Sequence, residues 1–479
     1  MQTRRMRCLV SPEPGSCTTW RLWRSCLALV EVTQIGKFEM TWTVKRFVST
    51  FLCLTIWGAM TGTAVGQRAV NVDALEARGL MVQKSQHLTM ITGARDRADV
   101  KEFNDVFEQA VGLLCQYFEI PESSAEDWHL VACVLRKQNE QTFVDAGLLT
   151  DDLPPFPAGF QRDRDIWIYV QDGDYYTRHL LLHEATHAFM QEFLQGYGPP
   201  WYAEGMAELL GVHRWQDGRL TINHRIGDRD EVPYWGRVKL IRRQLQSGTR
   251  MNLDEVFAIR NDAFLRVDAY AWAWAACQFF DSHPKFQALF RKLPSLANQS
   301  PQDFNRQFRE ALSENRDLAE REWNWLIDEI QYGYDVPLAA LTPVTKPTRQ
   351  GEQYSMQLDA TRGWQTTEIQ VQAGERLEFN VSGTYQVKHD GQPWSCQAGG
   401  VTLEYYRGRP LGQLVGAVLT AAEQGSNLDS GLGPIIDIGS KSEITCGQSG
   451  TLLLRINESP ADWSDNQGHL IVQVKRFSD

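Results

Sequence analysis

Two histidines and a glutamate in the middle of the chain have the types and spacing of a metal site. The segment LLLHEATHAFM contains His183, Glu184 and His187. On a helix, positions 183 and 187 lie one turn apart on one face, so both imidazoles can reach the same metal ion. Glu184 then projects about 100° away, beside the coordination position left open for water. The alternative is an ordinary helix whose two histidines bond to backbone or solvent.

A second acidic segment follows closely. The run WYAEGMAE begins at Trp201, directly after a Pro-Pro pair that favours a helix start. A catalytic zinc ion usually has three protein ligands and one water, often two histidines and one glutamate. Glu204 is therefore the predicted third ligand. Glu208, one turn later, is predicted to accept a hydrogen bond from the outer nitrogen of His183. The alternative is an exposed acidic pair on an ordinary helix.

Other histidines fit the same ion less well. His179, His183 and His187 are spaced by four residues. Residues eight apart on a helix lie about 12 Å apart, so His179 and His187 cannot share one zinc ion. His213 is predicted to be a helix-end or surface residue.

The two motifs together resemble the gluzincin branch of zinc peptidases, in which His-Glu-x-x-His precedes a helix that carries a glutamate. The run WYAEG at 201–205 is similar to the Trp-x-x-Glu-Gly element of that branch. The chain also resembles a bacterial family of uncharacterised exported proteins with a zincin core, over roughly residues 85–335. The resemblance implies an α+β, zincin-like fold with a mixed sheet and a helical part that carries the metal. It implies zinc held by His183, His187 and Glu204, with Glu184 as general base and Glu208 beside the ligands.

Such a site is expected to hydrolyse peptide bonds in peptides or proteins. Zinc lowers the pKa of its bound water to about 7 and polarises the scissile carbonyl. Glu184 would take the proton of that water and deliver it to the departing amine. The oxyanion needs another donor, and the resemblance implies Tyr270, because gluzincins place a tyrosine on a later helix. The alternative is that Tyr270 packs with Trp272 and Trp274.

Hydrophobic periodicity predicts the elements that position these residues. The expected elements are strands at 88–93, 128–136 and 165–171 and an amphipathic helix at 99–118, followed by an almost entirely helical region from about 175 to 334. The strand at 165–171 is expected to form the edge of the substrate cleft, where an extended peptide adds by main-chain hydrogen bonds. We therefore expect a metallopeptidase domain over 67–334.

The remaining residues have the pattern of an all-β region. The proline-rich segment 335–351 is predicted to be a linker. Residues 352–479 alternate in twos between Gly, Asn and Asp turns, which is typical of a β-sandwich. One turn crowds four oxygen-bearing side chains that suit calcium, namely Glu458, Asp462, Asp465 and Asn466. The alternative is an ordinary polar turn.

The run from Asn457 to Gly468 resembles the calcium-dependent galactose-binding β-sandwich lectins of bacteria, over about residues 352–477. This resemblance implies a lectin-like accessory domain with calcium and carbohydrate as ligands. The sequence differs from that family in having Glu458 where aspartate is usual. It also lacks the His-Pro-x-Gln segment that helps to hold the sugar.

The N-terminus has the order of a secretory signal peptide. A Lys-Arg pair precedes an apolar run at 47–60, and the Ala-Val-Gly run at 64–66 fits a cleavage box. Met40 is the predicted start, so residues 1–39 would lie outside the translated chain, and residues 1–66 would leave the mature protein. An uncleaved membrane anchor is the alternative. We expect a protein exported to the periplasm, the cell surface or the medium, with no membrane span in the mature chain.

Export and charge limit the remaining possibilities. The formal net charge is −11, so bulk attraction to nucleic acid is not expected. Residues 1–66 carry eight basic and three acidic side chains, which leaves −16 on the remainder. Disulfides form outside the cytoplasm. The predicted pairs are Cys396–Cys446 and Cys115–Cys133, with Cys277 as a buried free thiol.

The sequence thus favours an exported, monomeric zinc peptidase with an accessory β-sandwich. The rival prediction is a non-catalytic cell-surface or secreted protein that binds glycan or protein and keeps a relic zincin core. The intact Glu184 favours the enzyme, because a relic has no need of a general base.

Overall fold

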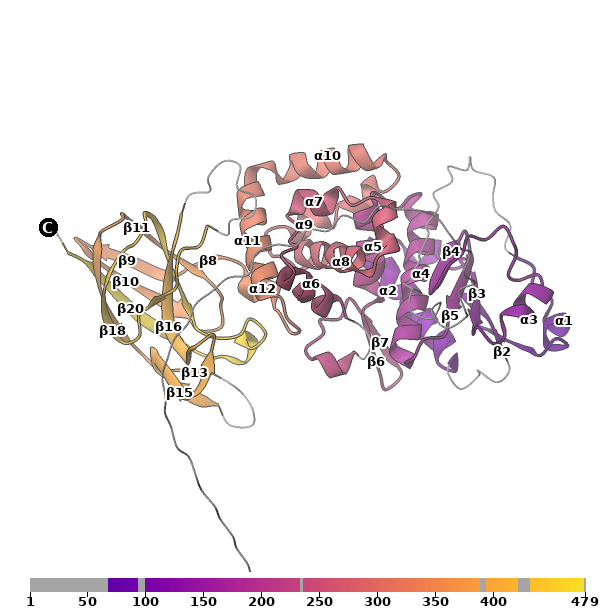
Figure 1. Cartoon of the computed structure of the whole chain (residues 1–479), viewed down its shortest axis with the longest axis horizontal. Helices are drawn as coiled ribbons and strands as arrows, with labels where there is room; N and C mark the ends of the chain where they lie inside the picture. Colours follow the sequence, from indigo (N-terminus) through magenta and orange to yellow (C-terminus); the bar gives the residue numbers. More distant parts are fainter. Residues whose placement is uncertain (1–67, 94–99, 233–235, 388–392, 421–430, 478–479) are drawn as a thin grey trace, which may run out of the picture. The chain divides into compact units, whose positions relative to one another are not determined.

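The structure, a computed structural model, describes residues 68–93, 100–232, 236–387, 393–420 and 431–477 (Figure 1). The predicted signal segment and the predicted start at Met40 lie outside the described residues. In the described ranges, no helix is long and apolar enough to cross a bilayer.

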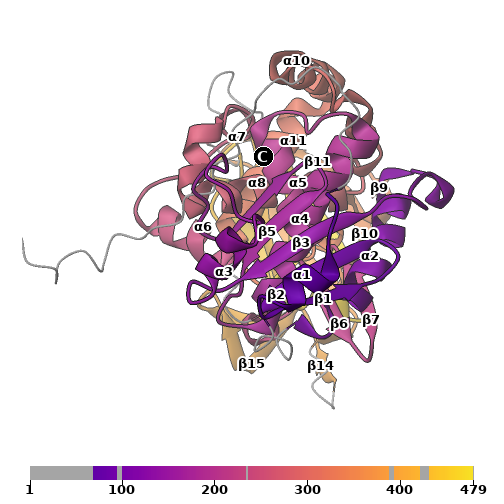
Figure 2. The ribbon, with the colours of Figure 1, turned by 90° about the vertical axis from the view of Figure 1, so that its right-hand side faces the viewer.

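A five-stranded sheet supports the first half of the fold. Its strands are β1 (Leu80–Lys84), β2 (Leu88–Gly93), β3 (Leu130–Leu135), β4 (Gly159–Arg162) and β5 (Asp165–Tyr169), in the order β1-β2-β3-β5-β4. β2, β3 and β5 are parallel, and β1 and β4 run antiparallel to their neighbours at the two edges. Figure 2 shows β5, β3, β2 and β1 side by side in this order. The three predicted strands are confirmed, whereas the two short antiparallel strands were not predicted.

The two faces of this sheet pack against different helices. One face is covered by α2 (Phe103–Phe118) and α4 (Asp174–Leu194), and the other by α1 (Val72–Glu76) and α3 (Glu140–Asp145). All six residues of β3 are buried, as expected for a central strand with both faces covered. Because side chains alternate along a strand, Ala132 belongs to the first core and Cys133 to the second.

The predicted helical region is confirmed, apart from one hairpin. Its helices are α5 (Pro200–Gly211), α6 (Arg237–Gln246), α7 (Leu253–Phe257), α8 (Val267–Ser282), α9 (Gln287–Phe290), α10 (Pro301–Leu312) and α11 (Arg316–Glu329), and its hairpin consists of β6 (His213–Gln216) and β7 (Arg219–Ile222). α5 and α8 lie in close contact. A Cβ atom at Gly205 would lie 2.6 Å from the Ala273 carbonyl oxygen, so only glycine allows this approach.

Two sheets form the C-terminal part. One sheet has the order β18-β12-β20-β10-β9 and the other β15-β16-β19-β11-β8. Their strands are β8 (Thr342–Pro343), β9 (Thr345–Gln350), β10 (Gln353–Asp359), β11 (Gln365–Val371), β12 (Arg376–Ser382), β15 (Gly399–Tyr406), β16 (Arg409–Leu419), β18 (Lys441–Thr445), β19 (Gly450–Ile456) and β20 (His469–Arg476), and smaller pieces are β13 (Tyr385–Val387), β14 (Trp394–Cys396) and β17 (Ile436–Asp437). Both sheets contribute to one core, for example Phe379 and Leu454. The chain is therefore mixed α+β with a sheet-rich C-terminal region that has the two-sheet arrangement of a sandwich.

The segment 335–351 differs from the predicted linker. It contains α12 (Val336–Ala339) as well as β8 and β9. Its prolines are compatible with these elements, because Pro337 lies in the first turn of the helix and both strands are edge strands. All described residues fall in one unit, residues 50–479, so the predicted division into two domains stays a prediction.

The predicted disulfides are wrong. Cys115, Cys133, Cys277, Cys396 and Cys446 are all buried free thiols. Cys115 and Cys133 lie in different cores on opposite faces of the sheet, so their sulfur atoms cannot meet. Cys396 lies on β14, where its thiol contacts the Tyr385 hydroxyl at 3.2 Å. The prediction for Cys277 is confirmed.

We expect all five thiols to react with a maleimide when protein purified without reductant is unfolded in denaturant. In the folded protein the reaction should be slow, because the thiols are buried and burial raises the pKa of Cys133 to about 12. Mass spectrometry counts the adducts. A larger number of adducts after prior reduction would show that a disulfide is present.

Candidate metal centre

α4 and α5 bring the motif side chains together in the interior. His183, Glu184 and His187 lie in the middle of α4, and Glu204 and Glu208 lie on α5. Each of these five side chains belongs to a residue that is at most 5% exposed. Buried ionisable groups are costly unless they are paired or hold an ion. This degree of burial therefore excludes the alternative of an exposed acidic pair.

The donor atoms of the three predicted ligands converge. His183 Nε2 lies 3.3 Å from Glu204 Oε2 and 3.3 Å from His187 Nε2, and His187 Nε2 lies 3.5 Å from Glu204 Oε2. In a tetrahedral zinc site with bonds of 2.0–2.1 Å, neighbouring ligand atoms are about 3.3–3.4 Å apart. The spacing of the three donors thus fits a single zinc ion.

The charges of this cluster also favour a dication. It contains three buried carboxyl groups, from Glu184, Glu204 and Glu208, and one buried guanidinium, from Arg237. With neutral imidazoles these groups carry a net charge of about −2, which an apolar interior does not tolerate. A divalent cation would bring the cluster to neutrality.

The same unbalanced charge shifts the pKa values of the cluster. Burial alone would lower the pKa of His183, but the hydrogen bond to Glu204 and the neighbouring carboxylates raise it to about 9. Burial alone would raise the pKa of Glu204, but His187 and His183 lower it to about 2. Burial raises the pKa of Glu184, in the direction that suits a general base. The neighbouring carboxylates thus favour positive charge at His183.

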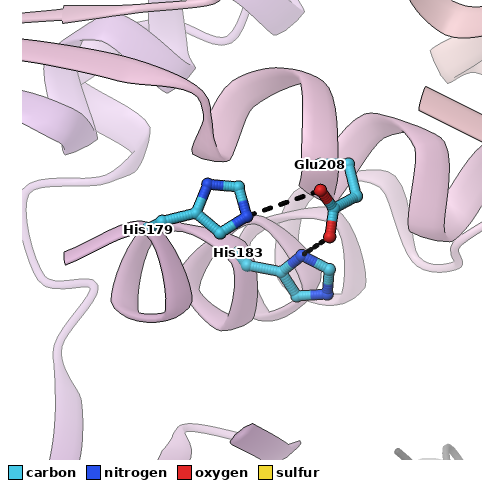
Figure 3. Close-up of side chains that lie close together, drawn as sticks. All are labelled: His179, His183 and Glu208. Atoms are coloured by element: carbon cyan, nitrogen blue, oxygen red, sulfur yellow. Dashed lines mark ion pairs between the residues drawn. The ribbon is translucent and has the colours of Figure 1, made fainter. Parts of the chain in front are cut away.

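A second group of donors shares His183 (Figure 3). Glu208 Oε2 lies 3.5 Å from His179 Nε2, and Glu208 Oε1 lies 3.5 Å from His183 Nδ1. These distances suit ion pairs, but His183 Nδ1 has no hydrogen-bond partner among the described residues. The predicted hydrogen bond from His183 to Glu208 is therefore absent, although the two side chains are neighbours. His179 lies with Glu208 rather than with Glu204, which agrees with its exclusion as a ligand of the first group.

Two tyrosines flank the cluster on different elements. The ring of Tyr270, on α8, lies 6.2 Å from that of His183, and it also packs against Phe264. Tyr197, in the loop between α4 and α5, places its ring 5.9 Å from that of His187. Sequence reasoning overlooked Tyr197, because α4 continues to Leu194 and no local pattern shows that the following loop returns to His187.

The edge strand of the sheet is not the one predicted. β5, at 165–169, lies between β3 and β4, so β4 is the edge strand. Gly159 on β4 lies against the general-base candidate, because a Cβ atom built on it would overlap Glu184 Oε1. β4 escaped prediction because its four residues are too few to display a strand pattern.

His213 lies just after the end of α5, as the helix-end prediction has it, but it is buried rather than at the surface. It begins β6, its ring stacks on Tyr175 at 4.6 Å, and Nδ1 lies 2.9 Å from the Gly211 carbonyl oxygen. Burial lowers its pKa to about 3. Among the described residues it belongs to neither group of metal-binding donors.

The predicted calcium residues form a polar turn around η7 (Trp463–Asp465). Glu458 and Asn466 are buried and joined by a hydrogen bond of 2.5 Å from the Asn466 amide. Asn466 Oδ1 has no hydrogen-bond partner in the described part. The carboxylates of Glu458, Asp462 and Asp465 do not come within 4.8 Å of one another as a group. The turn therefore offers oxygen donors, but its three carboxylates do not converge as the donor atoms of His183, His187 and Glu204 do.

Glu458 should make the folded protein less stable as the pH rises. Burial, with the charges of Asp465 and Asp462, raises its pKa from 4.5 to about 8. Between these values the unfolded chain binds fewer protons than the folded one, so the free energy of unfolding falls by at most about 1.4 kcal/mol per pH unit. Glu458→Gln keeps the hydrogen bond from Asn466 and should remove this loss. Urea unfolding from pH 5 to 8 measures the free energy of unfolding of both proteins.

The exposed Glu443, on β18, supplies the control variant Glu443→Gln, which should retain the pH dependence of the wild type. An identical pH dependence in the wild type and Glu458→Gln would contradict the assignment. Added calcium should raise the melting temperature of the wild type, and not of Glu458→Gln, if the turn binds this ion.

Comparisons with known proteins return distant structural neighbours. No family model matches the sequence, and the search of curated proteins gave no significant match. The solved structures that match include "EclA N-terminal domain; PllA-like lectin", with 20% identity, a TM-score of 0.19, and coverage of 26% of this chain and 95% of that one. They also include "IMPa metallopeptidase in complex with T-antigen", with 12% identity, a TM-score of 0.16, and coverage of 75% and 38%. A functionally unknown conserved protein from Bacillus anthracis str. Ames has 15% identity, a TM-score of 0.15, and coverage of 27% and 22%. These TM-scores are too low to carry an argument about function.

Proposed function

We propose that the protein is an exported zinc-dependent peptidase of gluzincin type. The observation that carries this proposal is the mutual spacing of 3.3–3.5 Å between His183 Nε2, His187 Nε2 and Glu204 Oε2. A glutamate directly follows the first histidine in the same helix. This combination of a three-donor site and an adjacent carboxylate suits hydrolysis assisted by a metal.

A zinc ion bound there would supply Lewis acidity to a substrate carbonyl and acidify water in its open coordination position. Glu184 acts as the base, because its carboxyl group is next to the ligands and buried, and burial raises its pKa. It removes a proton from the attacking water and later gives it to the leaving amine. Tyr270 is the proposed hydrogen-bond donor to the oxyanion, since its ring is adjacent to that of His183.

The substrate peptide would lie along β4 rather than along β5. β4 is the last strand in the sheet order, and its Gly159 faces Glu184. A peptide held by main-chain contacts to this strand would present its carbonyl beside the general base with little selection for side chains. The absence of a Cβ atom at position 159 keeps room for the Glu184 carboxylate.

The C-terminal sandwich is proposed as an accessory region that binds carbohydrate, with calcium at the turn that contains Glu458 and Asn466. Its buried Asn466 Oδ1, which lacks a hydrogen-bond partner in the described part, is compatible with a bound cation. The competing proposal for the whole chain, a non-catalytic binding protein, makes different predictions for the variants below.

Glu184→Gln should retain zinc, and its rate of hydrolysis should fall by about 10²–10⁴-fold, because the amide cannot accept the proton. His183→Ala should lose both zinc and activity, because a ligand is missing. Zinc content by mass spectrometry and cleavage of an unstructured protein such as casein measure the two effects.

Glu192→Gln is the matched control, since Glu192 lies on the same helix but pairs with Arg164 at the surface. It should retain both zinc and activity. A wild type that binds zinc but cleaves neither casein nor a broad peptide library would contradict the peptidase proposal and favour the binding protein.

Gly159→Ala should reduce turnover by about 10²-fold while zinc content stays unchanged. The new methyl group would displace the carboxylate of Glu184, and small misplacements of a catalytic group have effects of this size. Stability should change little, because the displaced atoms are the end of a flexible side chain.

Gly112→Ala, in the middle of α2, is the matched control because its added methyl group meets only one atom, at 3.8 Å. It should stabilise the helix by about 0.5–1 kcal/mol and leave kcat unchanged. Full activity of Gly159→Ala would mean that Glu184 is not held against β4 during turnover.

A further inference from the structure

Arg237 is the basic side chain that neutralises part of the buried cluster. It is the first residue of α6 and only 7% exposed. Its guanidinium contacts both oxygens of Glu208, with Nε 2.9 Å from Oε2 and Nη2 2.6 Å from Oε1. A bidentate salt bridge of this kind fixes the plane of a carboxylate as well as its position.

The carboxylate of Glu208 contacts both this arginine and two imidazoles. Each of its oxygens receives one Arg237 nitrogen and faces one histidine at 3.5 Å, with His179 on Oε2 and His183 on Oε1. Among the described residues, neither His179 Nε2 nor His183 Nδ1 has a hydrogen-bond partner, so these contacts do not fix the carboxylate. Arg237 does so, and it thereby sets where the negative charge faces the outer nitrogen of His183.

The same guanidinium fills the place of a cation in the second donor group. His179, His183 and Glu208 lie close enough to hold a metal ion. Both oxygens of Glu208 already bind Arg237, however, and its positive charge within hydrogen-bond distance opposes a second dication. The three-donor set that contains Glu204 has no such arginine contact among the hydrogen bonds and ion pairs of the described residues.

Arg237 also contacts the proposed oxyanion donor. Its guanidinium carbon lies 5.6 Å from the centre of the Tyr270 ring, which itself lies 6.2 Å from the His183 ring. One side chain on α6 therefore touches residues of both α5 and α8 that border the candidate zinc site. Its removal would loosen Glu208 and Tyr270 together.

We propose that Arg237 is a positioning residue that holds Glu208 against His183 and reserves the site for a single metal ion. The inference rests on the proposed zinc-dependent function. Arg237 does not touch the three predicted ligands, so it acts on the metal through Glu208. Mutation of residues just outside the ligands of a metal site typically changes metal affinity by 10- to 100-fold.

The test compares wild type, Arg237→Gln and Arg237→Lys for zinc affinity, zinc stoichiometry, kcat and KM, and for the visible spectrum of the cobalt(II)-substituted protein. We expect one zinc ion per wild-type chain. Arg237→Gln should bind zinc about 10- to 100-fold more weakly and show a shifted cobalt spectrum. Its kcat should fall by a larger factor than its KM changes. Arg237→Lys should recover part of the loss, since it restores the charge but not the paired contact.

A double-mutant cycle gives an independent measure. Glu208→Gln should cost less zinc affinity in the Arg237→Gln background than in the wild type, because the two residues act as a unit. Arg243→Gln, at an exposed position on the same helix, should match the wild type in every measurement. Arg237→Lys carries the test if Arg237→Gln fails to fold.

Two results separate the inference from the function on which it rests. A wild type without zinc binding overturns the proposed function and the inference with it. A wild type that binds zinc and cleaves protein, with folded Arg237 variants that keep its zinc affinity and cobalt spectrum, overturns the inference alone. Two zinc ions per wild-type chain would also overturn it.

Discussion

The balance of charge inside the α4–α5 helix pair is the constraint on which the rest of the structure depends. Glu184, Glu204 and Glu208 are buried with one guanidinium, that of Arg237, and with imidazoles that carry a full positive charge only when protonated. An apolar interior tolerates this set only when a cation completes it. The carboxylates of this set raise the pKa of His183 against the effect of burial. A structural helix pair would gain more from apolar side chains at these positions.

The architecture around the cluster serves to hold its helices at short range. α4 packs on one face of the sheet, and Gly205 allows α8 to approach α5 at the level of the predicted third ligand. Gly159 likewise allows the side chain of Glu184 to lie against β4. In both places the absence of a Cβ atom makes room for a neighbour. The packing that gives this region its stability therefore also sets the positions of its buried glutamate side chains.

Sequence periodicity predicted the long elements well and the short ones poorly. The motif helices, the amphipathic helix α2 and the parallel strands were all evident, because each repeats its pattern over several residues. β4 and the strands of 335–351 have too few residues for a pattern, and their prolines favoured a linker. The disulfides were predicted from compartment and spacing along the chain, whereas the sheet places Cys115 and Cys133 on opposite faces.

The sequence by itself determined the candidate ligands, because a four-residue spacing on a helix already places His183 and His187 on one face. It also indicated Glu204, through the short acidic segment that follows. Only the tertiary structure brought Arg237 to Glu208, across 29 residues and from a different helix. Nothing local distinguishes this arginine from the exposed Arg242 and Arg243 of the same helix. The physical reason is that a helix motif fixes neighbours along one chain segment, whereas buried charge pairs depend on which segments the fold packs together.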